Sequence, residues 1–153
     1  MALLDYAPEF TTAEAVEIAH RLFAIPVAAG ILPSERDQNF LLTLEDGEKR
    51  VLKIANARED PDLLDAENAI MLHVADRVAA APRPFPTSDG DFAARIAGAN
   101  GNEHYVRLIS FLPGRPMGQV KRQSAELLHD LGRRVGQLNR ALADFDHPAA
   151  HRD

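Results

Sequence analysis

The stretch Arg50-Val51-Leu52-Lys53-Ile54 has the pattern of a short β-strand with a lysine inside it. Because side chains alternate along a strand, Val51 and Lys53 share one face, and Leu52 and Ile54 share the other. We expect Leu52 and Ile54 to join an apolar core beneath the next helix of the chain. Val51 is small enough for a flat ring to lie beside it. Taken alone, the strand fits an ordinary half-exposed lysine best, so the role of Lys53 depends on the partners that the next helix supplies.

The next segment has the pattern of a helix that carries one carboxylate among its apolar residues. Asp60 and Pro61 are a favourable N-cap and first residue, and we expect the helix to run to about Ala80. Its apolar stripe, with Glu67 near the middle, consists of Leu63, Ile70, Met71, Val74 and Val78. A carboxylate facing a sheet is costly unless paired, so we predict an ion pair between Glu67 and Lys53. The alternative is a Glu67 at the helix edge that reaches water.

A polar segment joins two predicted strands at positions 32–40. Its candidate binding residues are Ser34, Glu35, Arg36, Gln38 and Asn39. Backbone N–H groups of such a turn, with a serine hydroxyl and an arginine, can bind phosphate oxygens. The segment is not a glycine-rich P-loop, and taken alone it is explained more simply as a solvated hairpin turn.

An apolar strand predicted at 104–111 runs into Leu112-Pro113-Gly114. A strand that ends in a linker leaves backbone donors and acceptors free. The backbone groups of Ser110 and Leu112 can form hydrogen bonds with the edge of an adenine ring. A core strand followed by a turn explains the same composition equally well.

The remaining pattern predicts an α+β fold. Thr11 and Glu14 offer a capping box for a helix that ends before Pro26. Asp46-Gly47 is a strong hairpin signal. Five strands are predicted, at 27–32, 39–44, 50–55, 92–97 and 104–111, and a last helix begins after Ser124. We expect a mainly antiparallel sheet of about five strands, packed against the helix after the third strand, with helices on one side.

Composition limits the possible functions. A chain of 153 residues suits one domain, and its net charge of −6 argues against nucleic acid as a partner. No apolar run approaches the ~18 residues of a membrane span, and the N-terminus is not a secretory signal. Zero cysteines fit a reducing compartment, so a cytoplasmic protein with no membrane partner is expected. The six histidines show no ligand spacing, so no metal site is expected in this chain alone.

The last helix carries more apolar residues on one face than one edge of a small sheet needs. These residues are Leu128, Leu131, Val135, Leu138 and Leu142. An exposed patch of this kind usually marks an interface. We therefore expect this face to meet another lobe, or to support a homodimer in its absence.

Four segments together give a resemblance to a known family. They are Leu32–Phe40, Val51–Asn56, Asp62–Asn68 and Val106–Pro116. In this order they resemble the N-terminal lobe of the aminoglycoside phosphotransferase-like kinases, and within that family the hydroxylysine kinases and the kinase-like domains fused to class III aminotransferases. The resemblance covers roughly residues 10–146.

The resemblance implies a protein-kinase-like N-terminal lobe at 1–116, and a linker and helix at 117–153 that lead to a C-terminal lobe. It implies ATP or GTP between two lobes, with Mg²⁺ held by the second. Lys53 would bind phosphate, with Glu67 as its partner. The Ser34–Asn39 segment would cover the nucleotide, and Ser110–Leu112 would form the hinge that binds the base.

The expected function is the nucleotide-binding lobe of a small-molecule kinase that acts on a hydroxyl of an amine-bearing metabolite. No His-Gly-Asp catalytic loop or metal-binding aspartate motif occurs in this sequence. We therefore assign no catalytic residue and expect this chain alone to be inactive, with the acceptor bound by the other lobe. The alternative is a non-catalytic kinase-like binding or regulatory module of a larger fused protein.

Overall fold

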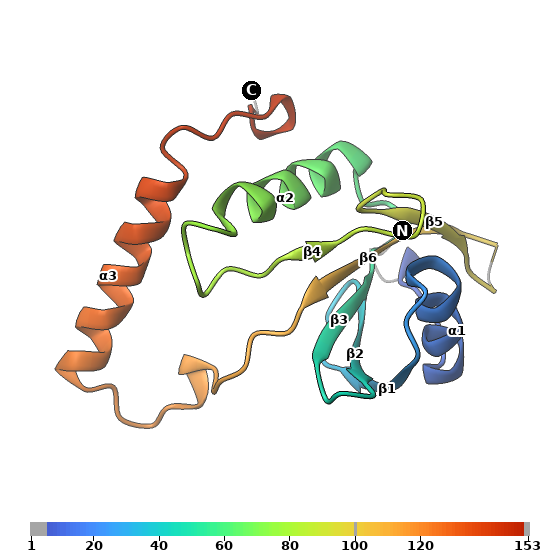
Figure 1. Cartoon of the computed structure of the whole chain (residues 1–153), viewed down its shortest axis with the longest axis horizontal. Coiled ribbons are helices and arrows are strands. Elements are labelled where there is room, and N and C mark those ends of the chain that lie inside the picture. The colour runs from blue at the N-terminus through green and yellow to red at the C-terminus, as the bar shows by residue number, and fades with distance from the viewer. Residues whose placement is uncertain (1–5, 100, 152–153) are drawn as a thin grey trace.

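The structure, a computed structural model, describes residues 6–99 and 101–151 (Figure 1). Its main elements are α1 (Thr12–Phe23), β1 (Val27–Leu32), β2 (Gln38–Leu44), β3 (Lys49–Ile54), α2 (Pro61–Val74), β4 (Pro84–Phe85), β5 (Ala94–Ala97), β6 (Glu103–Ser110) and α3 (Ala125–Ala141). Short 3-10 helices, η2 (Met117–Gln119) and η3 (Pro148–Ala150), precede and follow α3.

All six strands belong to one antiparallel sheet. The order is β1-β2-β3-β6-β4, and β5 pairs with the first half of β6. The predicted α+β class and antiparallel sheet are confirmed. The sequence missed β4, whose Pro84 and Phe85 pair with Ile109 and Leu108 at the sheet edge.

Local signals place the element ends. Thr11 Oγ1 accepts from the Glu14 backbone N–H (3.2 Å), and the Glu14 carboxylate accepts from the Thr11 backbone N–H (2.7 Å), so the capping box forms. The Asp60 carboxylate caps α2 by accepting from the Asp62 N–H (3.0 Å). Gly47 adopts φ 85° in the β2–β3 turn, a conformation that favours glycine.

The core of the sheet lies under α1, which corrects one prediction. Leu52 and Ile54 are fully buried, in a cluster with Ile18 and Phe23 of α1. Within the described residues, α2 contributes nothing to this cluster. The period-2 pattern of β3 was right, but the helix that covers its apolar face is the one before the sheet, not the one after it.

Helix α2 lies on the other side of the sheet, so the expectation of helices on one side is wrong. Arg107 of β6 donates hydrogen bonds to α2, while the next residue, Leu108, is in the core with α1. Successive strand residues point to opposite faces. Figure 1 shows α1 and α2 on different sides of the strands. α2 is also shorter than predicted, because it ends at Val74 rather than near Ala80.

Helix α3 stands apart from the sheet and approaches the C-terminal part of α2 (Figure 1). The prediction that it exposes an apolar stripe is confirmed for four of its five residues, since Leu128, Leu131, Val135 and Leu138 are 37–49% exposed, whereas Leu142 is half-buried. An apolar pocket of about 380 Å³ lies between α2 and α3, lined in part by Val74, Val78 and Leu138. Among the helices of the described chain, none is long and apolar enough to cross a membrane.

Candidate functional site

The strand register aligns two rows of side chains on the sheet face that points away from α1. The first row consists of Leu32, Asn39, Lys53 and Arg107, which are cross-strand neighbours in that order. The second consists of Gly30, Leu41, Val51 and Ile109. Directly opposed residues carry side chains on the same face, close enough to interact. A polar, cationic row therefore lies beside an apolar one, and we call this face the open face.

Lys53 is half-buried in the middle of the first row. In the part of the chain that the structure describes, its ammonium group has no hydrogen bond or ion pair. A half-buried cation without a partner lacks the compensation that such charges usually find within a protein. It is thus free to bind an anionic group that approaches the open face.

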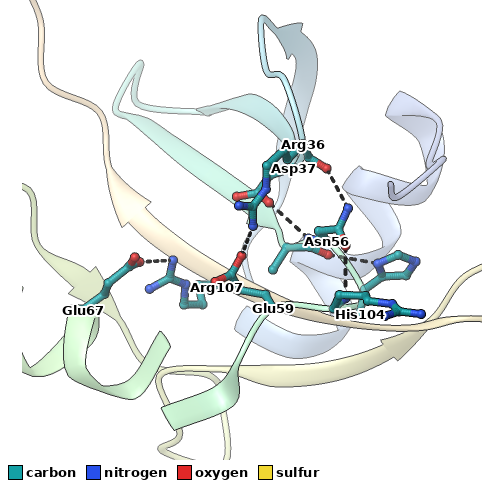
Figure 2. A network of polar contacts seen from close by, with 9 residues as sticks. Arg36, Asp37, Asn56, Glu59, Glu67, His104 and Arg107 are labelled. Carbon is teal, nitrogen blue, oxygen red and sulfur yellow. Dashed lines mark hydrogen bonds and ion pairs between the residues drawn. The ribbon is translucent and has the colours of Figure 1, made fainter. Parts of the chain in front are cut away.

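Glu67 does not pair with Lys53 in this structure. Its Oε2 accepts from Arg107 Nη2 at 2.6 Å, and its side chain is 49% exposed (Figure 2). The prediction that Glu67 lies at the centre of a buried stripe is therefore wrong. The residues of α2 that are buried are Leu64, Ala66, Asn68 and Val74. The polar Asn68 takes a buried position because its Oδ1 accepts from Arg107 (3.3 Å).

The predicted nucleotide-covering loop is tied to the segment after β3 (Figure 2). Asp37 Oδ1 accepts from the Asn56 backbone N–H (3.1 Å), and Asn56 Nδ2 donates to the Arg36 carbonyl (3.4 Å). Arg36 forms an ion pair with Glu59. These contacts fix the end of the loop that leads into β2, while Ser34, Glu35 and Arg36 stay exposed.

Two further residues of this loop face in opposite directions. Asn39 lies in the row with Lys53; its Nδ2 donates to Ser34 Oγ (3.3 Å), and its buried Oδ1 has no donor among the described residues. Gln38 lies on the core side, opposite Ile54, and its amide exchanges two hydrogen bonds with the backbone of Phe10 (2.7 and 2.8 Å). Any contact between Gln38 and a ligand on the open face would therefore come from its backbone.

The predicted hinge lies at the end of β6. The Ser110 backbone N–H donates to the Arg83 carbonyl (2.8 Å), and Ser110 Oγ accepts from the Arg83 N–H (2.9 Å). The Ser110 donor is therefore occupied. Leu112 is 46% exposed, and among the described residues its backbone N–H has no hydrogen bond to another backbone group. Of the two, Leu112 offers the available donor.

The residues of the open face suit a nucleotide. Within residues 6–99 and 101–151 they combine a cation without a partner at Lys53, a buried acceptor without a donor at Asn39 and an apolar row at Val51. Magnesium in proteins usually keeps several waters and is bound through one or two carboxylates together with substrate phosphates. The described residues contain no group of three or more His, Asp or Glu side chains that could hold a metal ion by themselves.

Comparison with known proteins identifies the family. The model of the "Phosphotransferase enzyme family" matches residues 29–153. The chain belongs to this family. Hydroxylysine kinase of Mus musculus is 32% identical over 160 residues, and a homoserine kinase of Xanthobacter autotrophicus is 32% identical over 116 residues. The two alignments cover 92% and 76% of this chain.

Solved structures confirm the kinase-like fold of this phosphotransferase-family chain. The amicoumacin kinase hAmiN, in complex with AMP-PNP, Ca²⁺ and Ami, matches 91% of the chain with a TM-score of 0.74 at 16% identity. A microcompartment-associated aminopropanol kinase matches 92% with a TM-score of 0.69 at 13% identity. The chain spans only 41% of the mouse relative and 42% of the hAmiN chain.

Sequence reasoning missed Arg107 and Asn56. Arg107 is a charged residue among the apolar neighbours Val106, Leu108 and Ile109 of β6, and this was the available signal of a buried, paired cation. Asn56 lies shortly after β3 and is 1% exposed. Its side chain donates to the Arg36 carbonyl, 20 positions earlier, and no local pattern reveals such a contact.

Proposed function

We infer that residues 6–116 form the N-terminal, nucleotide-binding lobe of a kinase that uses ATP or GTP. Lys53 would bind the nucleotide phosphates, and Asn39 and the exposed backbone of Ser34–Arg36 would cover them. The observation that carries this proposal is Lys53, which has no partner among the described residues and lies on the open face of a phosphotransferase-family sheet. In kinase-type folds a strand lysine beside the phosphates is a recurring part of the site.

The base would lie on the apolar row. Leu41, Val51 and Ile109 present apolar side chains next to Lys53, on the same face. The exposed Leu112 backbone lies just after the end of β6 and would hydrogen-bond the base edge. These two features favour a flat heterocycle attached to phosphates over a bare anion.

The acceptor would be a hydroxyl of an amine-bearing metabolite. Two relatives are kinases named for hydroxylysine and homoserine, and each of these molecules carries a hydroxyl and an amine. The groups that bind the acceptor, hold Mg²⁺ and orient the hydroxyl would belong to a second lobe. Residues 117–153 would lead to it, with the apolar face of α3 as a contact. Bound Mg²⁺ would supply charge neutralisation at the phosphates.

Isothermal titration of ATP and of GTP, each with Mg²⁺, into the purified protein tests the nucleotide site. Lys53→Met should weaken binding roughly 10- to 100-fold, because a charge-assisted contact is lost. Lys49→Met is the matched control, since Lys49 lies on the same strand and face but is exposed at the other end. Equal affinities of wild type and Lys53→Met would reject the proposal.

A further inference from the structure

Arg107 is the buried cation of the open face. Its side chain is 4% exposed, and its cross-strand partner in β3 is Lys53. The side chains of Lys53 and Arg107 thus extend side by side from the same face of the sheet. A buried charge is tolerated only when its hydrogen bonds are satisfied, so the burial of Arg107 depends on its acceptors.

The acceptors of Arg107 in the described part of the chain lie on one turn of α2. Nη1 donates to the Leu64 carbonyl and to Asn68 Oδ1 (both 3.3 Å), and Nη2 donates to Glu67 Oε2 (2.6 Å). Asn68 in turn donates to the Phe92 carbonyl (3.3 Å). The planar guanidinium therefore fixes both the position of α2 over the sheet and the direction of the Glu67 carboxylate.

Only half of the Glu67 carboxylate is used in this arrangement. Oε2 is bound to Arg107, whereas Oε1 has no hydrogen bond within the described part of the chain. The side chain is half-exposed on the same face as Lys53, for which the described residues supply no partner. A carboxylate has two oxygens and can accept from two cations at once.

We propose that Arg107 is the positioning residue of the nucleotide site: it holds α2 and one oxygen of Glu67, so that the other oxygen receives Lys53 when nucleotide is bound. This inference rests on the proposed nucleotide site at Lys53. The Glu67 carboxylate then binds two cations, and Arg107 of β6, rather than Lys53, sets the position of α2. Helix α2 is then held in place before nucleotide arrives.

The test compares Arg107→Met with Arg50→Met. Arg50 lies in the same sheet and also has an ion pair, but on the core side (Glu48, 2.7 Å). Nucleotide affinity of the folded protein should fall about 3- to 10-fold for Arg107→Met and stay unchanged for Arg50→Met. The ¹⁵Nζ signal of Lys53, assigned by its loss in Lys53→Arg, should shift on ATP binding in wild type. Both Arg107→Met and Glu67→Gln should lose most of that shift.

A purely structural Arg107 would lower the urea midpoint of Arg107→Met but leave both the affinity and the Lys53 signal as in wild type, and this result overturns the inference. If Arg107→Met fails to fold, Arg107→Lys and Glu67→Gln carry the test. Glu67→Gln keeps an oxygen for Arg107 but removes the charge offered to Lys53. Unchanged affinity in both of these variants also overturns it. Failure of the proposed function looks different, because Lys53→Met would then bind nucleotide as wild type does.

Discussion

The two faces of the sheet differ in almost every physical respect, although their residues alternate along the same strands. On the side of α1, Phe40, Leu52 and Leu108 are at most 1% exposed and form the core. One position along each strand, Asn39, Lys53 and Arg107 make a polar row on the open face. Neighbouring residues of the same strand thus serve different purposes: one stabilises the core, and the next lies on the face proposed to bind the ligand. Substitutions at neighbouring positions should therefore have separable effects.

The largest effect should come from a pair of neighbours on β3. Leu52→Ala removes a fully buried side chain and should cost about 2–5 kcal/mol of unfolding free energy. Val51→Ala, on the open face, should cost less than about 1 kcal/mol but weaken nucleotide binding. Urea unfolding and nucleotide titration measure the two quantities. A Val51→Ala variant as unstable as Leu52→Ala would contradict the claim that the two faces of the sheet contribute differently to stability.

A smaller loss of stability should result from substitution of Asn56, which connects the loop at 34–38 to the segment after β3. Asn56→Ala removes the bond to the Arg36 carbonyl and the bond from the Arg58 N–H (3.0 Å). Leaving these groups unsatisfied should cost about 1–3 kcal/mol. Hydrogen exchange of the amides at 34–38 should become faster. Unchanged exchange there would show that the loop is held by other contacts.

Helix α3 offers the reverse case, an apolar surface outside the core. Leu131→Asp should change the unfolding free energy by no more than about 0.5 kcal/mol, because Leu131 is 42% exposed. It should nevertheless abolish self-association, which we expect through this face when no other lobe covers it. Sedimentation velocity is the measurement. A wild-type chain that stays monomeric at high concentration would contradict the expectation.

The smallest effect concerns pH at the contact between α2 and the end of α3. Hydrogen bonds from Arg77 (2.6 Å) and then His73 (3.0 Å) lower the pKa of Asp144 from 3.8 to about 2. Since the pKa of the folded state is the lower one, the stabilisation is present above about pH 4 and is lost as the pH falls toward 2. Asp144→Asn should remove this pH dependence. A titration of the Asp144 carboxyl carbon by NMR with a midpoint near 3.8 would rule out the contact.

Local sequence signals predicted two helix starts and one hairpin turn correctly, although not the C-terminal end of α2. Thr11 with Glu14, Asp60 with Pro61, and Asp46-Gly47 each place a helix start or a turn through contacts within a few residues. Strand alternation correctly put Leu52 and Lys53 on different faces. Such features depend on neighbours in the chain, so a single sequence contains the information for them.

Long-range pairing was not predictable in the same way. From the sequence we predicted that α2 covers the core and that Glu67 forms an ion pair with Lys53, because Lys53 is the nearest upstream cation on a predicted strand face. The Glu67 partner in this structure, Arg107, lies 40 positions downstream, in a strand whose register a sequence pattern does not define. β4 was missed for a similar reason, since two residues that include a proline carry no strand pattern and pair only because β6 lies beside them.

Titration of ¹⁵N-labelled protein with ATP and Mg²⁺, monitored by backbone amide shifts, tests the central claim most directly. The separation of the two faces predicts shifts at the loop 34–39, at Lys53 and Arg107, and at Leu112, with little change in α1. Shifts concentrated in α1 or in the pocket between α2 and α3, or no shifts at saturating nucleotide, would contradict the assignment of the open face as the nucleotide site.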